Sequence, residues 1–119
     1  MRLRGLPGLD VDAGLAFVGN SADVYVRLLR RFVQLHSGDV PQMIGHAARG
    51  ERLPLQGLAH SIKGGAATLG LSGLTQLARQ IEEASMSAPP SSLVELARTL
   101  EAQHGALDRH LIRACGPAP

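Results

Sequence analysis

The fold is decided by the stretch Leu55-Gln-Gly-Leu-Ala-His60-Ser-Ile-Lys63-Gly64-Gly65-Ala-Ala-Thr-Leu-Gly70. On an α-helix, with about 100° per residue, its apolar side chains fall on a single stripe, formed by Leu55, Leu58, Ile62, Ala66 and Leu69. His60 lies within about 20° of the direction opposite this stripe, and Lys63 and Gly64 flank it. The pattern predicts a helix that is buried along one side and presents His60 to solvent.

The neighbours of His60 leave room and supply one positive charge. Lys63 is the only lysine of the chain and lies one helical turn beyond His60 on the same side. Gly64 and Gly65 each lower helix stability by about 0.5–1 kcal/mol relative to alanine, which indicates that something must approach closely here. A neutral imidazole has a free ring nitrogen near pH 7 and is a nucleophile toward phosphorus. We therefore expect His60 to be reactive and Lys63 to pair with a negative group bound to it.

The other parts of a phosphoryl-transfer enzyme are missing from the sequence. It contains no glycine-rich nucleotide loop, no Gly-x-x-x-x-Gly-Lys-Ser/Thr motif and no acidic cluster placed for Mg²⁺. The remaining histidines share no i,i+4 spacing typical of a metal site; they are His36, His46, His104 and His110. We therefore predict a protein that is not an enzyme with its own ATP site, that has no cofactor or metal of its own, and whose partner supplies the Mg²⁺.

The composition favours one all-helical domain without a membrane segment. The 119 residues are 45% hydrophobic but only 3% aromatic, so the core must consist of Leu, Ala, Val and Ile, which favours helices packed on helices. The formal net charge is +2, and the charges are scattered rather than gathered in a basic block, which argues against nucleic-acid binding. One cysteine fits a reducing compartment, and no apolar run approaches the roughly 18–20 residues of a membrane span. We expect a cytoplasmic location without membrane insertion.

Capping residues, glycine breaks and apolar periodicity predict the helices. An antiparallel four-helix bundle is expected from residues 21–36, 53–70, 72–85 and 92–114, with short accessory helices at residues 10–18 and 39–49. The last helix is expected to begin at the capping-box pattern Ser92-Leu-Val-Glu95. Residues 1–8 are expected to be a flexible lead-in, residues 9–115 the bundle domain and residues 116–119 a frayed tail.

The segment Ala59-His60-Ser-Ile-Lys63-Gly64-Gly65-Ala-Ala-Thr-Leu-Gly70 resembles the signature of histidine-containing phosphotransfer (HPt) domains of multistep two-component signalling. Upstream residues resemble the HPt modules that end bacterial hybrid sensor kinases, namely Leu6-Pro-Gly-Leu-Asp10, Gly14-Leu15, Asn20, Tyr25, Leu28-Leu29 and Phe32. The resemblance covers about residues 6–111. The sequence departs from many family members at Gly65, where they carry Ser or Ala.

This resemblance implies a four-helix bundle whose exposed histidine takes a phosphoryl group from the aspartate of one receiver domain and passes it to another. By position, His60 is the expected phospho-acceptor, Lys63 its electrostatic partner and Gly64 the point of close approach. The implied partners are response-regulator receiver domains, which hold the Mg²⁺. From the facing of the helices, we expect the receiver to dock on Gln56, Gly57, Ala67, Leu53 and Leu15.

Two alternatives remain open on the sequence. In a purely structural helical interaction module His60 would be incidental, and the protein would carry no phosphoryl group. A small nucleic-acid-binding bundle would use Arg27, Arg30 and Arg31, which we expect instead to form a solvated face. The sequence also leaves open whether the chain is a free protein, expected to be a monomer, or the C-terminal module of a membrane-bound hybrid kinase.

Overall fold

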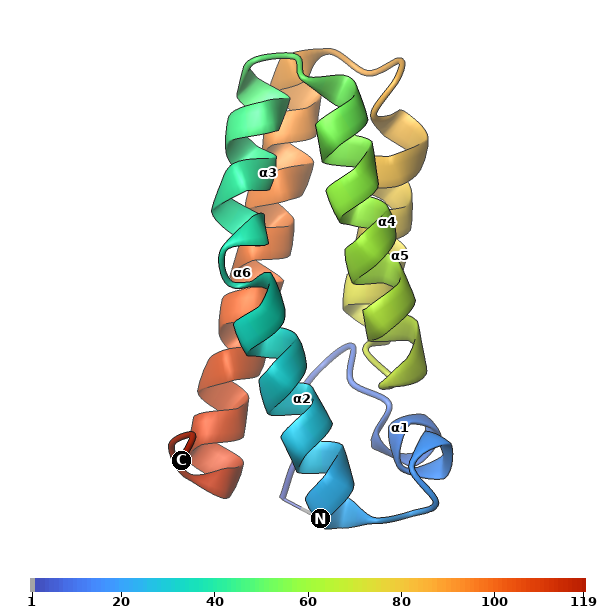
Figure 1. Cartoon of the computed structure of the whole chain (residues 1–119), viewed down its shortest axis with the longest axis vertical. Helices are drawn as coiled ribbons and strands as arrows, with labels where there is room; N and C mark the ends of the chain where they lie inside the picture. The colour runs from blue at the N-terminus through green and yellow to red at the C-terminus, as the bar shows by residue number, and fades with distance from the viewer. Residues whose placement is uncertain (1) are drawn as a thin grey trace.

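The computed structural model describes residues 2–119, and within this range every regular element is an α-helix (Figure 1). The helices are α1 (Val11–Phe17), α2 (Ala22–His36), α3 (Asp39–Ala48), α4 (Arg52–Thr68), α5 (Ser72–Ala84) and α6 (Pro90–Cys115). Four packed columns alternate in direction, and they consist of α2 with α3, then α4, α5 and α6. The predicted all-α four-helix bundle is therefore confirmed. In this part of the chain no helix is both long and apolar enough to cross a membrane.

α3 belongs to the bundle, and the prediction that it is an accessory helix is wrong. It packs against α4 and α6 and buries Val40, Met43 and Ala47. The two residues that separate it from α2, Ser37 and Gly38, keep right-handed helical dihedral angles. α3 therefore continues the path of α2, and the two helices together form one column (Figure 1). α1 alone is an accessory helix, beside the C-terminal end of α4.

The apolar spacing of residues 21–36 predicts that Val24, Leu28, Phe32 and Leu35 face inward, but the buried side of α2 is rotated relative to this stripe. Its buried residues are Tyr25, Leu29, Phe32, Val33 and His36. The hydroxyl of Tyr25 donates a hydrogen bond of 2.6 Å to the carbonyl oxygen of Leu69, and the ring of His36 packs edge-on against that of Phe32. Because these rings occupy the interior, Leu35 is 63% exposed, and the prediction that it faces inward is wrong.

The sequence offers two candidate caps for each of the first two helices, Asp10 or Asp12 and Asn20 or Ser21, and the structure uses Asp10 for α1 and Ser21 for α2. Oδ1 of Asp10 and Oγ of Ser21 accept hydrogen bonds of 3.1 and 3.3 Å from backbone N–H groups of the following turn. The capping box predicted at Ser92 is wrong, because α6 begins at Pro90 without a side-chain cap. Proline suits this place, since its fixed φ matches the first helical turn and its missing N–H leaves no donor unpaired.

Residues 2–8 are packed on the bundle, in contrast to the flexible lead-in expected there. The side chain of Leu3 is fully buried, and its carbonyl oxygen accepts a hydrogen bond of 2.6 Å from Nε2 of His110. The carbonyl oxygen of Gly8 accepts another, of 3.1 Å, from the backbone N–H of Gly73. One apolar side chain and these carbonyl groups thus hold the segment against α5 and α6. Residues 116–119 follow the last turn of α6, and their fraying stays a prediction.

Gly70 lies between α4 and α5 in the chain and packs against the segment before α1. Its φ is +73°, a left-handed conformation that favours glycine. Its carbonyl oxygen accepts a hydrogen bond of 2.7 Å from the backbone N–H of Asp10, and a Cβ at this position would overlap the carbonyl oxygen of Asp10. The glycine that ends the quoted stretch therefore allows the chain before α1 to pack against the end of α4.

Candidate functional site

His60 lies on the outer side of α4, which the bundle covers only on the opposite side. The buried residues of this helix are Leu55, Ala59, Ile62 and Ala66. The side chain of His60 is 72% exposed, as the helical pattern predicts. Because α4 packs mainly against α5 and α3, the imidazole stands on a fixed element while remaining open to another molecule.

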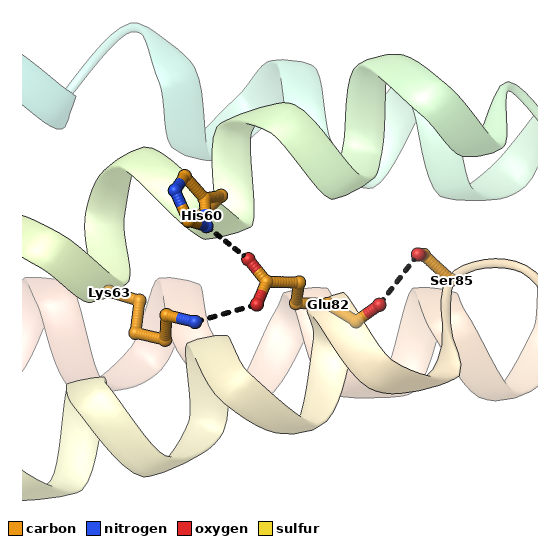
Figure 2. Close-up of polar contacts among 4 residues, drawn as sticks. All are labelled: His60, Lys63, Glu82 and Ser85. Atoms are coloured by element: carbon orange, nitrogen blue, oxygen red, sulfur yellow. Dashed lines mark hydrogen bonds and ion pairs between the residues drawn. The ribbon is translucent and has the colours of Figure 1, made fainter.

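One carboxylate from α5 binds both polar side chains of this face (Figure 2). Nδ1 of His60 lies 2.6 Å from Oε2 of Glu82, and Nζ of Lys63 donates a hydrogen bond of 2.6 Å to Oε1 of the same side chain. The side chains of Glu82 and Lys63 are only 20% and 26% exposed, so their ion pair is partly shielded from water. Oγ of Ser85, which is buried, donates to the carbonyl oxygen of Glu82 at 2.8 Å and fixes the end of α5.

These contacts decide which nitrogen of His60 is free. Hydrogen bonds from Lys63 and from His60 hold the pKa of Glu82 below its ordinary value, so this side chain is a carboxylate near pH 7. A carboxylate only accepts hydrogen bonds, so the proton of the neutral imidazole sits on Nδ1. Nε2 then holds the lone pair, and Figure 2 shows the second ring nitrogen directed away from Glu82. The site thus presents an oriented nucleophile toward solvent.

A shallow groove beside His60 combines side chains from α4 and from the end of α5. Its lining residues are Leu53, Gln56, Gly57, His60, Glu82, Glu83 and Met86. Leu53 and Met86 are 69% and 55% exposed, and large apolar side chains that share an exposed groove indicate a contact surface. The groove brings His60 together with three of the five expected docking residues, namely Leu53, Gln56 and Gly57.

The other two expected docking residues lie elsewhere. Ala67 is exposed, but it lines a second hollow, with Asp10 and Arg79, where α1 approaches α4 and α5. Leu15 of α1 is only partly exposed and packs against the core. The groove around His60 therefore includes neither of these residues.

Gly64 and Gly65 have different surroundings. A Cβ added at Gly64 would meet no atom within 4 Å, so the packing of the domain does not require glycine there. A Cβ at Gly65 would lie 3.4 Å from the ring of Phe32, in ordinary van der Waals contact, so this position faces α2 rather than open space. Only Gly64 is left for close approach by a partner, and this role stays a prediction.

A sequence model of the Hpt domain matches residues 27–109, a range that contains His60 and most of the bundle. The chain belongs to the Hpt domain family. This membership implies histidine phosphotransfer in a two-component phosphorelay, in which Hpt domains are phosphocarriers without kinase activity and interact with receiver domains. No curated protein and no solved structure matches the chain.

The other histidines of this Hpt domain have partners within the fold. Nδ1 of His36 and of His46 each lies 2.9 Å from one carboxylate oxygen, and Nε2 of His104 and of His110 each donates to a backbone carbonyl oxygen. Over residues 2–119, no three His, Cys, Asp or Glu side chains lie together as a possible metal site. Among residues 2–119, His60 is the only histidine that is exposed rather than buried or partly buried.

Sequence reasoning missed two residues of the Hpt site, Glu82 and Met86. Glu82 stands 22 positions after His60 on another helix, so no spacing rule for a single helix connects them. The available signal was its place beside the buried Ile81, at the border of the apolar stripe of α5, where a carboxylate can reach the neighbouring helix. Met86 follows the last turn of α5, where periodicity does not predict which way a side chain faces.

Proposed function

We propose that His60 is the phospho-acceptor of this Hpt domain, which takes a phosphoryl group from the aspartyl phosphate of one receiver domain and passes it to the aspartate of another. The observation that carries the proposal is the 2.6 Å hydrogen bond between Nδ1 of His60 and Glu82. It leaves Nε2 as the nucleophilic atom, on a side chain that is 72% exposed.

Each transfer forms one bond and breaks another. The lone pair on Nε2 of His60 attacks the phosphorus of the aspartyl phosphate, and the electron pair of the broken phosphorus–oxygen bond returns to the aspartate. The ring keeps its Nδ1 proton and becomes a cation, whose charge Glu82 balances. In the second transfer a receiver carboxylate attacks the phosphorus, and the electron pair of the phosphorus–nitrogen bond returns to Nε2. No net proton moves in either step.

Lys63 is proposed to bind the phosphoryl group, and Gly64 is proposed to leave space for the receiver surface that delivers this group. Nζ of Lys63 has three N–H groups and uses one for Glu82, so the others can bind a phosphoryl oxygen. Gly64 adds no side chain to the space that the receiver must enter. The receiver holds the Mg²⁺, which neutralises the charge that develops on the transferred group.

The receiver is proposed to dock on the groove beside His60. Leu53 and Met86 provide exposed apolar area, and Gln56 and Gly57 line the same groove as the imidazole. Because the donor and the acceptor must reach the same nitrogen, they bind to this surface one after the other. Ala67 and Leu15, which lie outside the groove, contribute only at the edge of the contact.

We also propose a wider context for the Hpt domain. Residues 9–115 form its functional unit, which acts as a monomer because each transfer uses one exposed His60. It works in the cytoplasm, either as a free carrier or as the C-terminal module of a hybrid sensor kinase. Support comes from the family membership and from the upstream resemblance to such modules. Light scattering of the purified domain, alone and after phosphorylation, tests the monomer.

Transfer from phosphorylated receiver domains tests the role of His60. A panel of receivers is loaded with radiolabelled acetyl phosphate and Mg²⁺ and mixed with the wild-type chain, His60→Gln or His46→Gln. His46 is a matched control, because its Nδ1 also faces a glutamate. Acid-labile label should appear on the wild type and on His46→Gln, but not on His60→Gln. Label that survives acid, or that persists in His60→Gln, contradicts the proposal, and no label on any folded chain favours a structural interaction module.

A further inference from the structure

A phosphoryl group on Nε2 of His60 changes the possible protonation states of the imidazole ring that Glu82 contacts. Such a ring either holds a proton on Nδ1 and is a cation, or is neutral and has a lone pair on Nδ1. Nδ1 lies 2.6 Å from Oε2 of Glu82, a distance at which two lone pairs repel each other and a proton between them makes a strong hydrogen bond. The geometry therefore favours the protonated ring.

The other groups around His60 reinforce this preference. Lys63, on the same helix, binds the second oxygen of Glu82 and helps to keep it ionised by lowering its pKa. The side chain of Glu83, on α5, lines the groove, but its carboxylate has no hydrogen bond or ion pair with any residue from 2 to 119. Within the same range, no titratable side chain of α1, α2 or α3, the other helices packed on α4, lines the groove. The charge in contact with Nδ1 is thus the carboxylate of Glu82.

We propose that Glu82 keeps Nδ1 protonated in phospho-His60 and thereby makes the phosphoryl group quick to transfer and short-lived. The inference rests on the proposed function, because it requires a phosphoryl group on Nε2. Glu82 is a positioning residue in this account. It contacts Nδ1 rather than the nitrogen that carries the phosphoryl group, and it acts through the imidazole ring.

The protonation state of the ring decides which group leaves the phosphorus. When the bond from phosphorus to Nε2 breaks, its electron pair goes to Nε2. A ring protonated on Nδ1 leaves as neutral imidazole, whereas a ring without this proton leaves as an imidazolide anion, which is a far poorer leaving group. The attacking atom is an aspartate oxygen during transfer. During hydrolysis it is a water oxygen, and both water protons stay on the released phosphate. Glu82 therefore accelerates both reactions.

The decay of phospho-His60 in the full chain tests this role. The wild type, Glu82→Gln and Glu83→Gln are loaded with phosphoramidate, a small phosphoryl donor, and desalted. Phosphorus NMR then follows the loss of phosphohistidine from about pH 5 to about pH 9, the range in which imidazoles titrate. Gln has the size of Glu, and its amide can donate to an unprotonated Nδ1. Glu83→Gln is the matched control, because it removes a negative charge from the same groove without a contact to His60.

The wild type and Glu83→Gln should lose phosphate at a rate that stays high toward alkaline pH. Glu82→Gln should decay more slowly above neutral pH, with its pH midpoint moved downward. A midpoint that lies lower by about one on the pH scale makes the decay about tenfold slower on the alkaline side. Equal rates and midpoints in the wild type and Glu82→Gln overturn the role of Glu82 and leave His60 as the acceptor. A wild-type chain that takes no phosphoryl group from phosphoramidate or from a receiver overturns the proposed function itself.

A measurement on the wild-type chain keeps the inference testable if Glu82→Gln does not fold. Nitrogen NMR of phospho-His60 reports the protonation of Nδ1 directly. Its midpoint should lie at higher pH than that of a short peptide carrying histidine phosphorylated on Nε2, because the peptide has no carboxylate fixed beside Nδ1. The same midpoint in the chain and in the peptide contradicts the inference.

Discussion

Nδ1 of His60 and Oε2 of Glu82 lie 2.6 Å apart, although the two residues are 22 positions apart and belong to different helices. The other oxygen of the same carboxylate binds Lys63, one turn after His60 on α4. One acidic side chain therefore orients the imidazole, holds the neighbouring cation and connects α4 with α5. In the proposed reaction the domain contributes this oriented nucleophile, and the receiver contributes the metal and the second reacting oxygen.

Replacing Lys63 by methionine should slow phosphotransfer and leave the helices intact. The change removes the cation proposed to bind a phosphoryl oxygen, but it keeps an apolar chain of similar length at a site that is 26% exposed. It also removes the first cause of the lowered pKa of Glu82. A lowered pKa stabilises the folded chain above the ordinary value of 4.5, and this contribution is lost as the pH falls through the folded-state pKa. Lys63→Met should therefore lose less stability on acidification than the wild type.

Rapid-mixing transfer from a labelled receiver and urea unfolding at several pH values measure these two effects of Lys63→Met. Lys63→Arg is the control, because it keeps the charge and should keep most of the acid dependence. A large loss of helical circular dichroism at neutral pH would show instead that Lys63 is needed for folding.

Gly64→Ala should make the fold more stable and transfer from a receiver slower. The added Cβ meets no atom within 4 Å, and alanine exceeds glycine in helix propensity by about 0.5–1 kcal/mol. The same methyl group projects into the space assigned to the receiver, and Gly64→Leu should enlarge the transfer defect. Urea unfolding and receiver transfer measure the two effects, and loading with phosphoramidate separates a docking defect from a less reactive His60. Transfer at the parent rate by Gly64→Leu would exclude close approach at this position.

Features that depend on residues close in sequence could be predicted from the sequence. The apolar spacing of residues 55–69 is sufficient to place His60 on the exposed side of its helix, because one helix defines both directions. The caps at Asp10 and Ser21 act within one turn, and the sequence predicted each of them as one of two neighbouring candidates. The family signature from Ala59 to Gly70 is a continuous segment, formed by α4 and the two residues after it, so it could be recognised without knowledge of the packing.

Features that depend on how helices meet could not be predicted. Ser37-Gly38 has the composition of a break, yet both residues keep helical angles, so the place of α3 in the bundle was missed. The rotation of α2 depends on contacts outside the helix, since Tyr25 donates to the carbonyl oxygen of Leu69 and the ring of Phe32 lies beside Gly65. Leu35 was therefore on the wrong side of the predicted stripe. The contact between His60 and Glu82 depends on how α4 and α5 are aligned along their lengths. The apolar periodicity predicts which side of each helix is buried, but it does not predict this alignment.

Gly70→Ala should destabilise the fold more than Gly50→Ala. Both glycines have positive φ, +73° and +69°, so each substitution costs about 1–2 kcal/mol in backbone strain. A Cβ at position 50 meets nothing within 4 Å, whereas at position 70 it overlaps the carbonyl oxygen of Asp10. We expect the second loss to exceed the first by about 1–3 kcal/mol, the usual cost of overpacking. Equal losses of unfolding free energy in the two variants, measured by urea unfolding, would mean that the segment before α1 moves aside without a loss of stability.

Tyr25→Phe should destabilise the chain by about 1–2 kcal/mol at neutral pH, because it leaves a carbonyl oxygen without its donor. The hydroxyl of Tyr25 is buried and donates to the carbonyl oxygen of Leu69, one of the last carbonyl groups of α4, which have no partner within the helix. The ring is otherwise retained in the variant, so the change isolates this hydrogen bond.

The alkaline pH dependence of Tyr25→Phe provides a second signature. Burial, followed by the charge of Asp10, raises the pKa of Tyr25 from 10.0 to about 12. A raised pKa means that the neutral phenol stabilises the fold fully below pH 10, and that this contribution is lost as the pH rises through about 12. The stability difference between the wild type and Tyr25→Phe should therefore be constant below pH 10 and shrink above it, with the titration of lysine and arginine cancelling in the comparison. Urea unfolding of both chains across this range measures the difference, and a difference that does not change with pH would contradict a buried neutral phenol.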